Sequence, residues 1–227
     1  LSRRQRQMCI RDRRCQFCHN PDTWNMTDKN GATWRSADEL LAQALRYRTY
    51  WKNGGGITVS GGEPLLQIDF LLDLFKKAKA KGIHTTIDTA GGPFIREEPF
   101  FSKFQELMQY TDLLLVDIKH IDEKSHKELT GKTNKNILDM IRFLSDIKKP
   151  VWIRHVLVPE RSDYDEYLNR LNDFIQTLDN VERVEILPYH TLGAYKWKEL
   201  GLDYPLEGIN PPSRERVENA KKILHCS

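Results

Sequence analysis

The sequence predicts an α/β fold built on a parallel sheet. Past residue 50, short apolar runs alternate five times with segments of helical period, and the connections are only a few residues long. This alternation is typical of βαβ units, whose strands run parallel. Polar and charged residues also come directly after the apolar runs, and such folds bind ligands at the carboxyl ends of their strands.

The expected strands are short and either β-branched or apolar throughout, as strands buried on both faces are. They cover residues 56–62, 83–92, 112–120, 150–160 and 183–190. Between them, apolar residues recur at helical spacing. The expected helices cover residues 68–82, 99–111, 134–149, 165–178 and 213–224.

Composition narrows the class of protein. With 227 residues, 39% of them hydrophobic, the chain is large enough for one globular domain with a substantial core. No apolar run approaches the ~20 residues that span a bilayer, and the basic N-terminus lacks the apolar stretch of a secretory signal. Three of the four cysteines crowd the N-terminus and Cys226 stands alone, which is not a disulfide framework. We therefore expect a cytoplasmic protein with no membrane partner.

Charge gives no support for a nucleic-acid partner. The net charge is +3, but residues 1–13 hold five arginines and one aspartate. The rest of the chain is therefore close to neutral, whereas a nucleic-acid-binding surface needs clustered basic residues.

Polar residues follow, end or interrupt each of the five expected strands, which predicts an active face where the strands end. The residues are Ser60 to Glu63, Asp88 with Thr89, Asp117 with Lys119, Arg154 with His155, and Tyr189 with His190. Glu63 has a second interpretation, as a cap for the helix that follows it.

The N-terminal cysteines point to a metal or redox site. Cys9, Cys15 and Cys18 form a C-x5-C-x2-C pattern, and His19 follows at once. The pair Cys15 and Cys18 alone leaves zinc, redox and iron–sulfur chemistry open.

Six segments narrow this choice: "CHNPDTW", "VSGGEPLLQ", "IDTAG", "LLLVDIKH", "VWIRHVLVP" and "ILPYHTLGAYKW". Together they resemble the radical S-adenosylmethionine superfamily and, within it, the family of pyruvate formate-lyase activating enzymes. The resemblance runs from about residue 14 to the end. It implies a partial (β/α)6-type barrel of parallel strands, with the first strand missing.

The resemblance also implies an activity. Family members generate a glycyl radical on pyruvate formate-lyase by reductive cleavage of S-adenosylmethionine at a [4Fe–4S] cluster. The implied partners are that protein substrate and flavodoxin or a similar reductant, and the implied state is a monomer.

Cluster ligands are implied at Cys15 and Cys18, the second and third positions of the family's C-x3-C-x2-C signature. The first position falls on Arg11, whose guanidinium has no lone pair to offer iron. Cys9 lies two residues too far away. We therefore expect the chain to assemble its cluster poorly.

Further roles are implied by position. The cofactor would be contacted by Phe17, Cys18, His19, Gly61, Gly62, Asp117, Ile118, Lys119, His120, Ile121 and His190. Gly61 and Gly62 would let the backbone approach the methionyl amine, where a Cβ would interfere. Arg154 would contact a carboxylate or the substrate. Asp88, Thr89 and Asp117 resemble a monovalent-cation site.

Residues 1–13 are interpreted as a non-native tail ahead of a core domain at 14–227. The segment "RRQRQMCIRDR" back-translates into a sequence that resembles a transposase sequencing adapter. The tail has few apolar residues, so we expect it to pack poorly.

Three alternatives remain open. The first is an activase of another glycyl-radical enzyme; many of those insert extra cysteine clusters after the signature, and no cysteine separates Cys18 from Gly61 here. The second is a zinc-binding module formed by Cys9, Cys15, Cys18 and His19. The third is an inert fragment, because the first cluster cysteine is absent.

Overall fold

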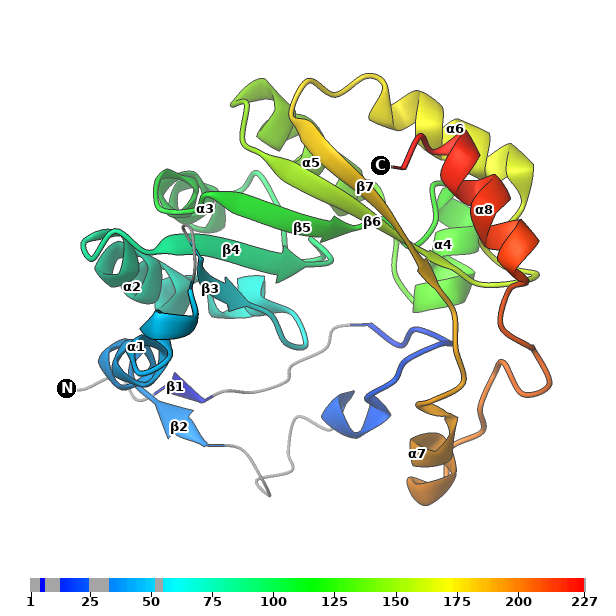
Figure 1. The fold of residues 1–227 in the computed structure, drawn as a ribbon, viewed down its shortest axis with the longest axis horizontal. Helices are drawn as coiled ribbons and strands as arrows, with labels where there is room; N and C mark the ends of the chain where they lie inside the picture. The colour runs from blue at the N-terminus through cyan, green and yellow to red at the C-terminus, as the bar shows by residue number, and fades with distance from the viewer. Residues whose placement is uncertain (1–4, 7–12, 25–32, 52–54, 227) are drawn as a thin grey trace.

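The computed structural model describes residues 5–6, 13–24, 33–51 and 55–226 (Figure 1). Its centre is a parallel sheet of five strands in sequential order, β3-β4-β5-β6-β7. These are β3 (Gly56–Val59), β4 (His84–Thr89), β5 (Leu113–Asp117), β6 (Val151–Leu157) and β7 (Val181–Pro188). The predicted α/β class and all five parallel strands are confirmed.

Helices connect the strands and cover the sheet (Figure 1). The five predicted helices are present as α2 (Ile68–Lys79), α3 (Phe100–Gln109), α5 (Lys135–Asp146), α6 (Asp165–Ile175) and α8 (Arg214–Ile223). Sequence analysis missed three others, α1 (Ala37–Leu45), α4 (Glu123–Thr130) and α7 (Ala194–Glu199). Short 3-10 turns are present at Pro21–Trp24, Arg48–Tyr50 and Pro64–Gln67. Within the described part of the chain, no helix has both the length and the apolar character needed to cross a membrane.

The core lies between the sheet and these helices. Alternate residues of β6 are buried, and β4 is buried along nearly its whole length. On the helices, fully buried Leu74, Phe75, Phe104 and Ile141 face the sheet at helical spacing. Burial of this apolar surface is the main force holding the sheet and helices together.

Helix α4 was missed because its sequence is mostly polar. Of its eight residues only His126, Leu129 and Thr130 are buried. The Asp122 side chain caps its first turn by accepting from the Ser125 N–H at 3.0 Å. Gly131 ends it at φ 80°, a left-handed conformation that glycine adopts without strain. The caps, rather than an apolar stripe, define this helix.

The N-terminal residues contact the rest of the chain at two described places. β1 (Gln5–Arg6) pairs antiparallel with β2 (Trp34–Arg35). Arg13, which sequence analysis assigned to the tail, is only 5% exposed, and its guanidinium donates to the Ala90 carbonyl at 2.9 Å. The packed core therefore includes Arg13, one residue before the expected boundary. Cys9, Arg11 and most of the expected tail lie outside the described residues.

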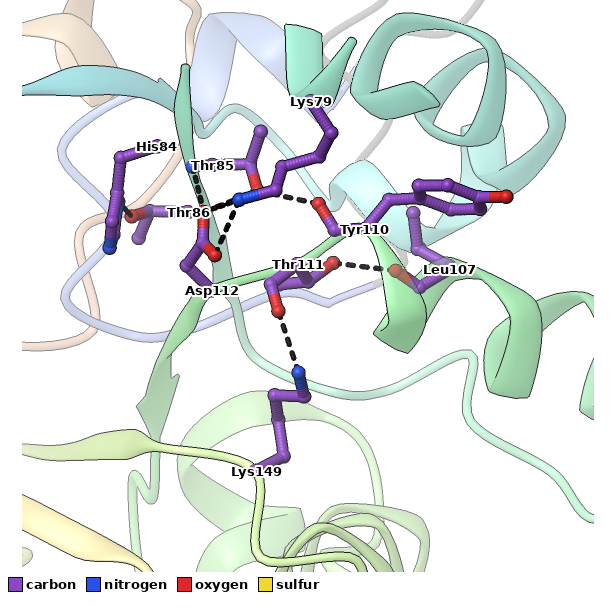
Figure 2. A network of polar contacts seen from close by, with 9 residues as sticks. All are labelled: Lys79, His84, Thr85, Thr86, Leu107, Tyr110, Thr111, Asp112 and Lys149. Carbon is purple, nitrogen blue, oxygen red and sulfur yellow. Dashed lines mark hydrogen bonds and ion pairs between the residues drawn. The ribbon is translucent and has the colours of Figure 1, made fainter. Parts of the chain in front are cut away.

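A polar network joins the amino ends of β4 and β5, at the edge of the sheet opposite the expected site (Figure 2). The Asp112 carboxylate accepts from Lys79 Nζ at 2.7 and 2.9 Å and from the Thr85 N–H at 2.8 Å. Lys149 Nζ donates to the Thr111 carbonyl at 2.7 Å. Burial raises the pKa of Asp112, but the bonds from Lys79 and Thr85 outweigh it and hold that pKa below its usual value.

We expect Asp112→Ala to lower the free energy of unfolding by about 2 kcal/mol, because the Thr85 N–H and the Lys79 ammonium lose their shared acceptor. Urea unfolding followed by circular dichroism measures the loss. The matched control is Asp73→Ala, which removes an exposed partner of Lys77 3.1 Å away and should cost under about 0.5 kcal/mol. Equal losses in the two variants would contradict a structural role for this network.

Candidate functional site

A cavity of about 500 Å³ opens at the carboxyl ends of β5, β6 and β7. Strands β5 and β6 supply a charged wall through Asp117 and Arg154, and Lys119 follows β5. An apolar wall comes from Val156, Leu187 and Pro188. The third side is the N-terminal loop with the β7 end, which lines the cavity with Cys15, Phe17, Cys18, His19, Asn20, Tyr189 and His190.

The cysteine loop, defined as residues 15–20, is tied to the end of α4. The Arg14 N–H donates to the Thr130 carbonyl at 2.9 Å, and the Gln16 N–H donates to the Leu129 carbonyl at 3.0 Å. The loop is closed by a turn in which the Cys18 N–H donates to the Cys15 carbonyl at 3.0 Å. Cys15 and Cys18 are 8% and 3% exposed, so both thiols are sheltered from bulk water beside the cavity.

Alternating charges form the cavity's opposite wall. Asp117 lies 2.9 Å from Lys119 Nζ and 3.3 Å from Arg154 Nε, and a second Arg154 nitrogen contacts Asp88. Strand register explains the arrangement, because Asp117 and Arg154 are direct partners on β5 and β6. Lys119 Nζ also lies 5.6 Å from the centre of the Phe17 ring, which links this wall to the cysteine loop.

The charged groups of this wall shift one another's pKa values. Burial raises the pKa of Asp117, but Lys119 and Arg154 outweigh it and hold the pKa below its ordinary value. Asp88 shows the opposite balance: burial raises its pKa, the Arg154 charge counteracts only part of the shift, and Asp117 adds to it. The wall therefore presents a firmly ionised Asp117 between two cations, a setting suited to a zwitterionic ligand.

Two stacked histidines line part of the cavity. The rings of His19 and His190 stack with centroids 4.0 Å apart and an interplanar angle of 26°. His19 Nε2 lies 3.2 Å from the His190 carbonyl oxygen. The sequence-predicted residues Phe17, Cys18, His19, Asp117, Lys119, His190 and Arg154 thus line one cavity, together with Cys15.

Other expected cofactor contacts lie elsewhere. Ile118 is buried in the main core, and Ile121 packs against it. His120 is 1% exposed and stacks edge-on against Tyr167, 4.4 Å between centroids. Gly61 and Gly62 follow β3 at the same edge of the sheet but do not line the cavity, and a Cβ at Gly61 would meet open space.

Of the three residues of the expected cation site, Asp88 and Asp117 face the same guanidinium, and Thr89 points away from them. Asp88 and Asp117 are joined by Arg154, whereas the Thr89 hydroxyl donates to Glu63 at 2.5 Å on the other side of β4. Positive charge at the two carboxylates is supplied here by the Arg154 guanidinium.

Glu63 links the loops that follow β3 and β4. As expected from sequence it caps the next turn, accepting from the Leu65 N–H at 3.1 Å. Its carboxylate also accepts from the Thr89 hydroxyl and from the Ala90 N–H at 3.1 Å. Burial raises the pKa of Glu63 to about 7, against the hydrogen bonds from Thr89 and Leu65 and the charge of Arg13.

The Glu63 pKa predicts a pH-dependent contribution to stability. Because the folded-state pKa of about 7 exceeds the ordinary glutamate pKa of 4.5, the folded state holds this proton more tightly than the unfolded chain does. Its contribution is complete below pH 4.5 and is lost as pH rises through 7, a change of up to about 3 kcal/mol. We expect Glu63→Gln to lack this loss when unfolding is measured from pH 5 to 8. An exposed control, Glu97→Gln, should follow the parent chain, and a parent-like profile for Glu63→Gln would contradict the assignment.

Among the described residues, the cavity offers the type of ligand that an iron–sulfur cluster needs, but too few of them. Cys15 and Cys18 offer two sheltered thiols beside a cavity with an ionic wall. In the part of the chain that the structure describes, no three histidine, cysteine or carboxylate side chains gather as a metal-binding group. The family resemblance would put the remaining ligand at the first signature position, where this chain has Arg11, a side chain that cannot ligate iron.

Comparison with known proteins identifies the class. Residues 11–174 match the radical SAM superfamily, and the chain belongs to that superfamily. The chain is 56% identical over 212 residues to the pyruvate formate-lyase-activating enzyme of Streptococcus mutans serotype c, covering 93% of this chain and 80% of that protein. It is 53% identical over 215 residues to the enzyme of the same name from Listeria monocytogenes serovar 1/2a, covering 94% and 86%. These relatives place the chain in the family of pyruvate formate-lyase-activating enzymes.

A solved structure agrees with this placement. The crystal structure of a domain of pyruvate-formate lyase-activating enzyme from Bacteroides vulgatus ATCC 8482 superposes with a TM-score of 0.61 at 28% identity, covering 76% of this chain and 94% of that one. Membership of the superfamily implies an iron–sulfur cluster and S-adenosylmethionine as cofactors.

Sequence reasoning missed the apolar wall of the cavity. Val156, Leu187 and Pro188 are ordinary strand residues, and only the alternation of side chains along β6 and β7 indicates which of them face the cavity. It also missed Trp197, whose tertiary contact is with the cysteine loop.

Proposed function

We propose that this chain activates pyruvate formate-lyase, using a cluster held at the cysteine loop and S-adenosylmethionine bound in the adjoining cavity. The observation that carries the proposal is that two buried thiols share one cavity with a wall of alternating charges. The names of the relatives supply the protein substrate.

A cluster and S-adenosylmethionine bound here would supply one-electron reductive cleavage of the cofactor and, through it, hydrogen-atom removal from a glycine of the protein substrate. Cys15 and Cys18 would hold the cluster. Lys119 and Arg154 would attract the methionyl carboxylate, and Asp117 would orient both cations. Phe17 and the His19–His190 stack offer flat surfaces for the adenine, and the apolar wall would exclude water.

The zinc module and the activase of a different glycyl-radical enzyme differ in how they would use the residues of this cavity. A zinc module would need His19 as a ligand, but that ring stacks on His190 and its Nε2 faces a carbonyl oxygen. An activase for a different glycyl-radical enzyme would use the same cavity, so only the protein substrate separates it from the proposed function.

The test is anaerobic reconstitution of an Arg11→Cys variant with iron and sulfide, followed by dithionite and S-adenosylmethionine. We expect 5′-deoxyadenosine, and a glycyl radical detected by electron paramagnetic resonance (EPR) once pyruvate formate-lyase is added. Cys18→Ala in the same background is the control and should yield neither. Tight binding of one zinc ion without 5′-deoxyadenosine would overturn the proposal, and a radical formed only on another glycyl-radical enzyme would overturn the choice of partner.

A further inference from the structure

The cysteine loop is held from two sides, and only one of them involves α4. On the other side lies the segment after β7, which turns below the sheet and forms α7 next to the N-terminal segment (Figure 1). Four residues of α7 and of the segment just before it make specific contacts with the loop, and we call them the α7 clamp: His190, Gly193, Lys196 and Trp197.

Trp197 makes the central contact. Its indole Nε1–H donates to the Cys18 carbonyl oxygen at 2.8 Å, and the side chain is 4% exposed. Its ring packs edge-on against Trp24 at 4.8 Å and Tyr204 at 5.3 Å, so it has little freedom to turn away. A buried carbonyl needs a donor, and here the rigid Trp197 side chain supplies one to the peptide of a candidate cluster ligand.

The other clamp residues fix the two positions after Cys18. Lys196 Nζ donates to Asn20 Oδ1 at 2.7 Å, and the His190 ring stacks on His19. Gly193 approaches so closely that an added Cβ would lie 2.5 Å from His19 Cα, which is a backbone atom. Glycine is therefore required there by the approach of two backbones and not by its own φ of −93°.

We propose that the α7 clamp positions the cysteine loop, and that Trp197 is the positioning residue that fixes the peptide of Cys18 and hence the direction of its thiol. The backbone bonds to α4 hold the loop through residues 14 and 16, before Cys18, whereas the clamp holds residues 18 to 20. The consequence for the cofactor rests on the proposed function, but the positioning itself is a property of the protein chain.

The test uses the metal-free full-length chain and the alkylation of its thiols by iodoacetamide, with each cysteine followed by peptide mass spectrometry. Trp197→Phe keeps an aromatic ring but removes the indole donor and part of the ring volume, a change that Trp152→Phe reproduces at a second site. Loss of one such hydrogen bond shifts a local opening equilibrium by about fivefold, so we expect Cys18 to react about fivefold faster. Cys226 packs against the main core, whereas Cys18 belongs to a separate apolar cluster. Cys226 therefore serves as the internal reference, and its alkylation rate should not change. Trp152→Phe is the matched control, because that indole donates to Glu182 on β7 at 3.4 Å.

Gly193→Ala and Lys196→Met give second and third variants that leave the indole in place. Each should also speed the reaction of Cys18, whereas Lys198→Met, which affects an exposed ion pair with Glu207, should not. An unchanged Cys18 rate in Trp197→Phe would overturn the proposal. So would an equal rise at Cys18 and Cys226, which would mean that Trp197 supports the fold as a whole.

A spectroscopic readout then connects the clamp to the cofactor. In an Arg11→Cys background, Trp197→Phe should change the EPR signal of the reduced cluster, because the cluster's surroundings tune it through the orientation of its ligands. If Arg11→Cys binds no cluster, the proposed function fails while the alkylation result still decides the clamp.

Discussion

Arg11→Cys is expected to raise the affinity of the chain for its cluster by about 100-fold. Loss of an outer-shell partner lowers metal affinity by up to about 100-fold, and loss of a ligand itself should lower it at least as much. Cys15 and Cys18 supply two buried thiols, and the resemblance to the family puts the third at position 11. A guanidinium cannot take that role, because it stays protonated and has no lone pair. Iron and sulfide content after anaerobic reconstitution, with 5′-deoxyadenosine formed under dithionite, measures the change.

Two controls separate a ligand from an added thiol. Arg14→Cys also introduces a cysteine, but at an exposed position next to Cys15, and should bind no more iron than the parent chain. Cys9→Ala in the parent chain should change nothing, because Cys9 lies two residues outside the required spacing. Full turnover by the parent chain, abolished in Cys9→Ala, would show that Cys9 is the third ligand.

The strands and the main helices could be predicted because their signals are local. Short apolar or β-branched runs define β3 to β7, and helical spacing defines α2, α3, α5, α6 and α8. Helix α1 was missed although its start is marked in sequence by Ser36 and Glu39, which form a capping box. Helix α4 gave no apolar signal at all.

The site could be predicted only as far as residues follow strand ends. That rule gathers Asp117, Lys119 and His190 at one cavity, whereas Arg154 reaches the same cavity from within β6. It cannot show that Arg154 bridges two carboxylates from different strands, since that depends on the register of three strands. Nor can it show that Trp197 reaches Cys18, because the two are 179 residues apart in sequence.

Arg154→Leu is expected to lower the free energy of unfolding by about 3 kcal/mol at pH 8, near the lower end of the range for breaking a buried ion pair. Arg154 contacts both Asp88 and Asp117, and the three side chains are 13 to 22% exposed. Its removal leaves two partly buried carboxylates facing each other with only Lys119 beside them. The loss is measured by urea unfolding and should exceed that of Arg96→Leu, which breaks an exposed pair with Asp139 and should cost under about 1 kcal/mol.

The pH dependence distinguishes lost charge balance from lost packing. Without Arg154, the folded-state pKa of Asp88, already raised by burial, should rise further. A raised folded-state pKa stabilises the folded state at low pH and loses that contribution as pH rises, so the deficit of Arg154→Leu should be smaller at pH 5 than at pH 8. Adding Asp88→Asn should restore about half of the lost stability at pH 8, because it removes the Asp88 charge, whereas Asp117 still has Lys119 beside it. The loss of unfolding free energy in Arg154→Leu could instead be equal at both pH values and unaffected by Asp88→Asn. That outcome would mean that Arg154 stabilises the fold only through the packing of its stem, and that the alternating charges of the cavity wall do not contribute to stability.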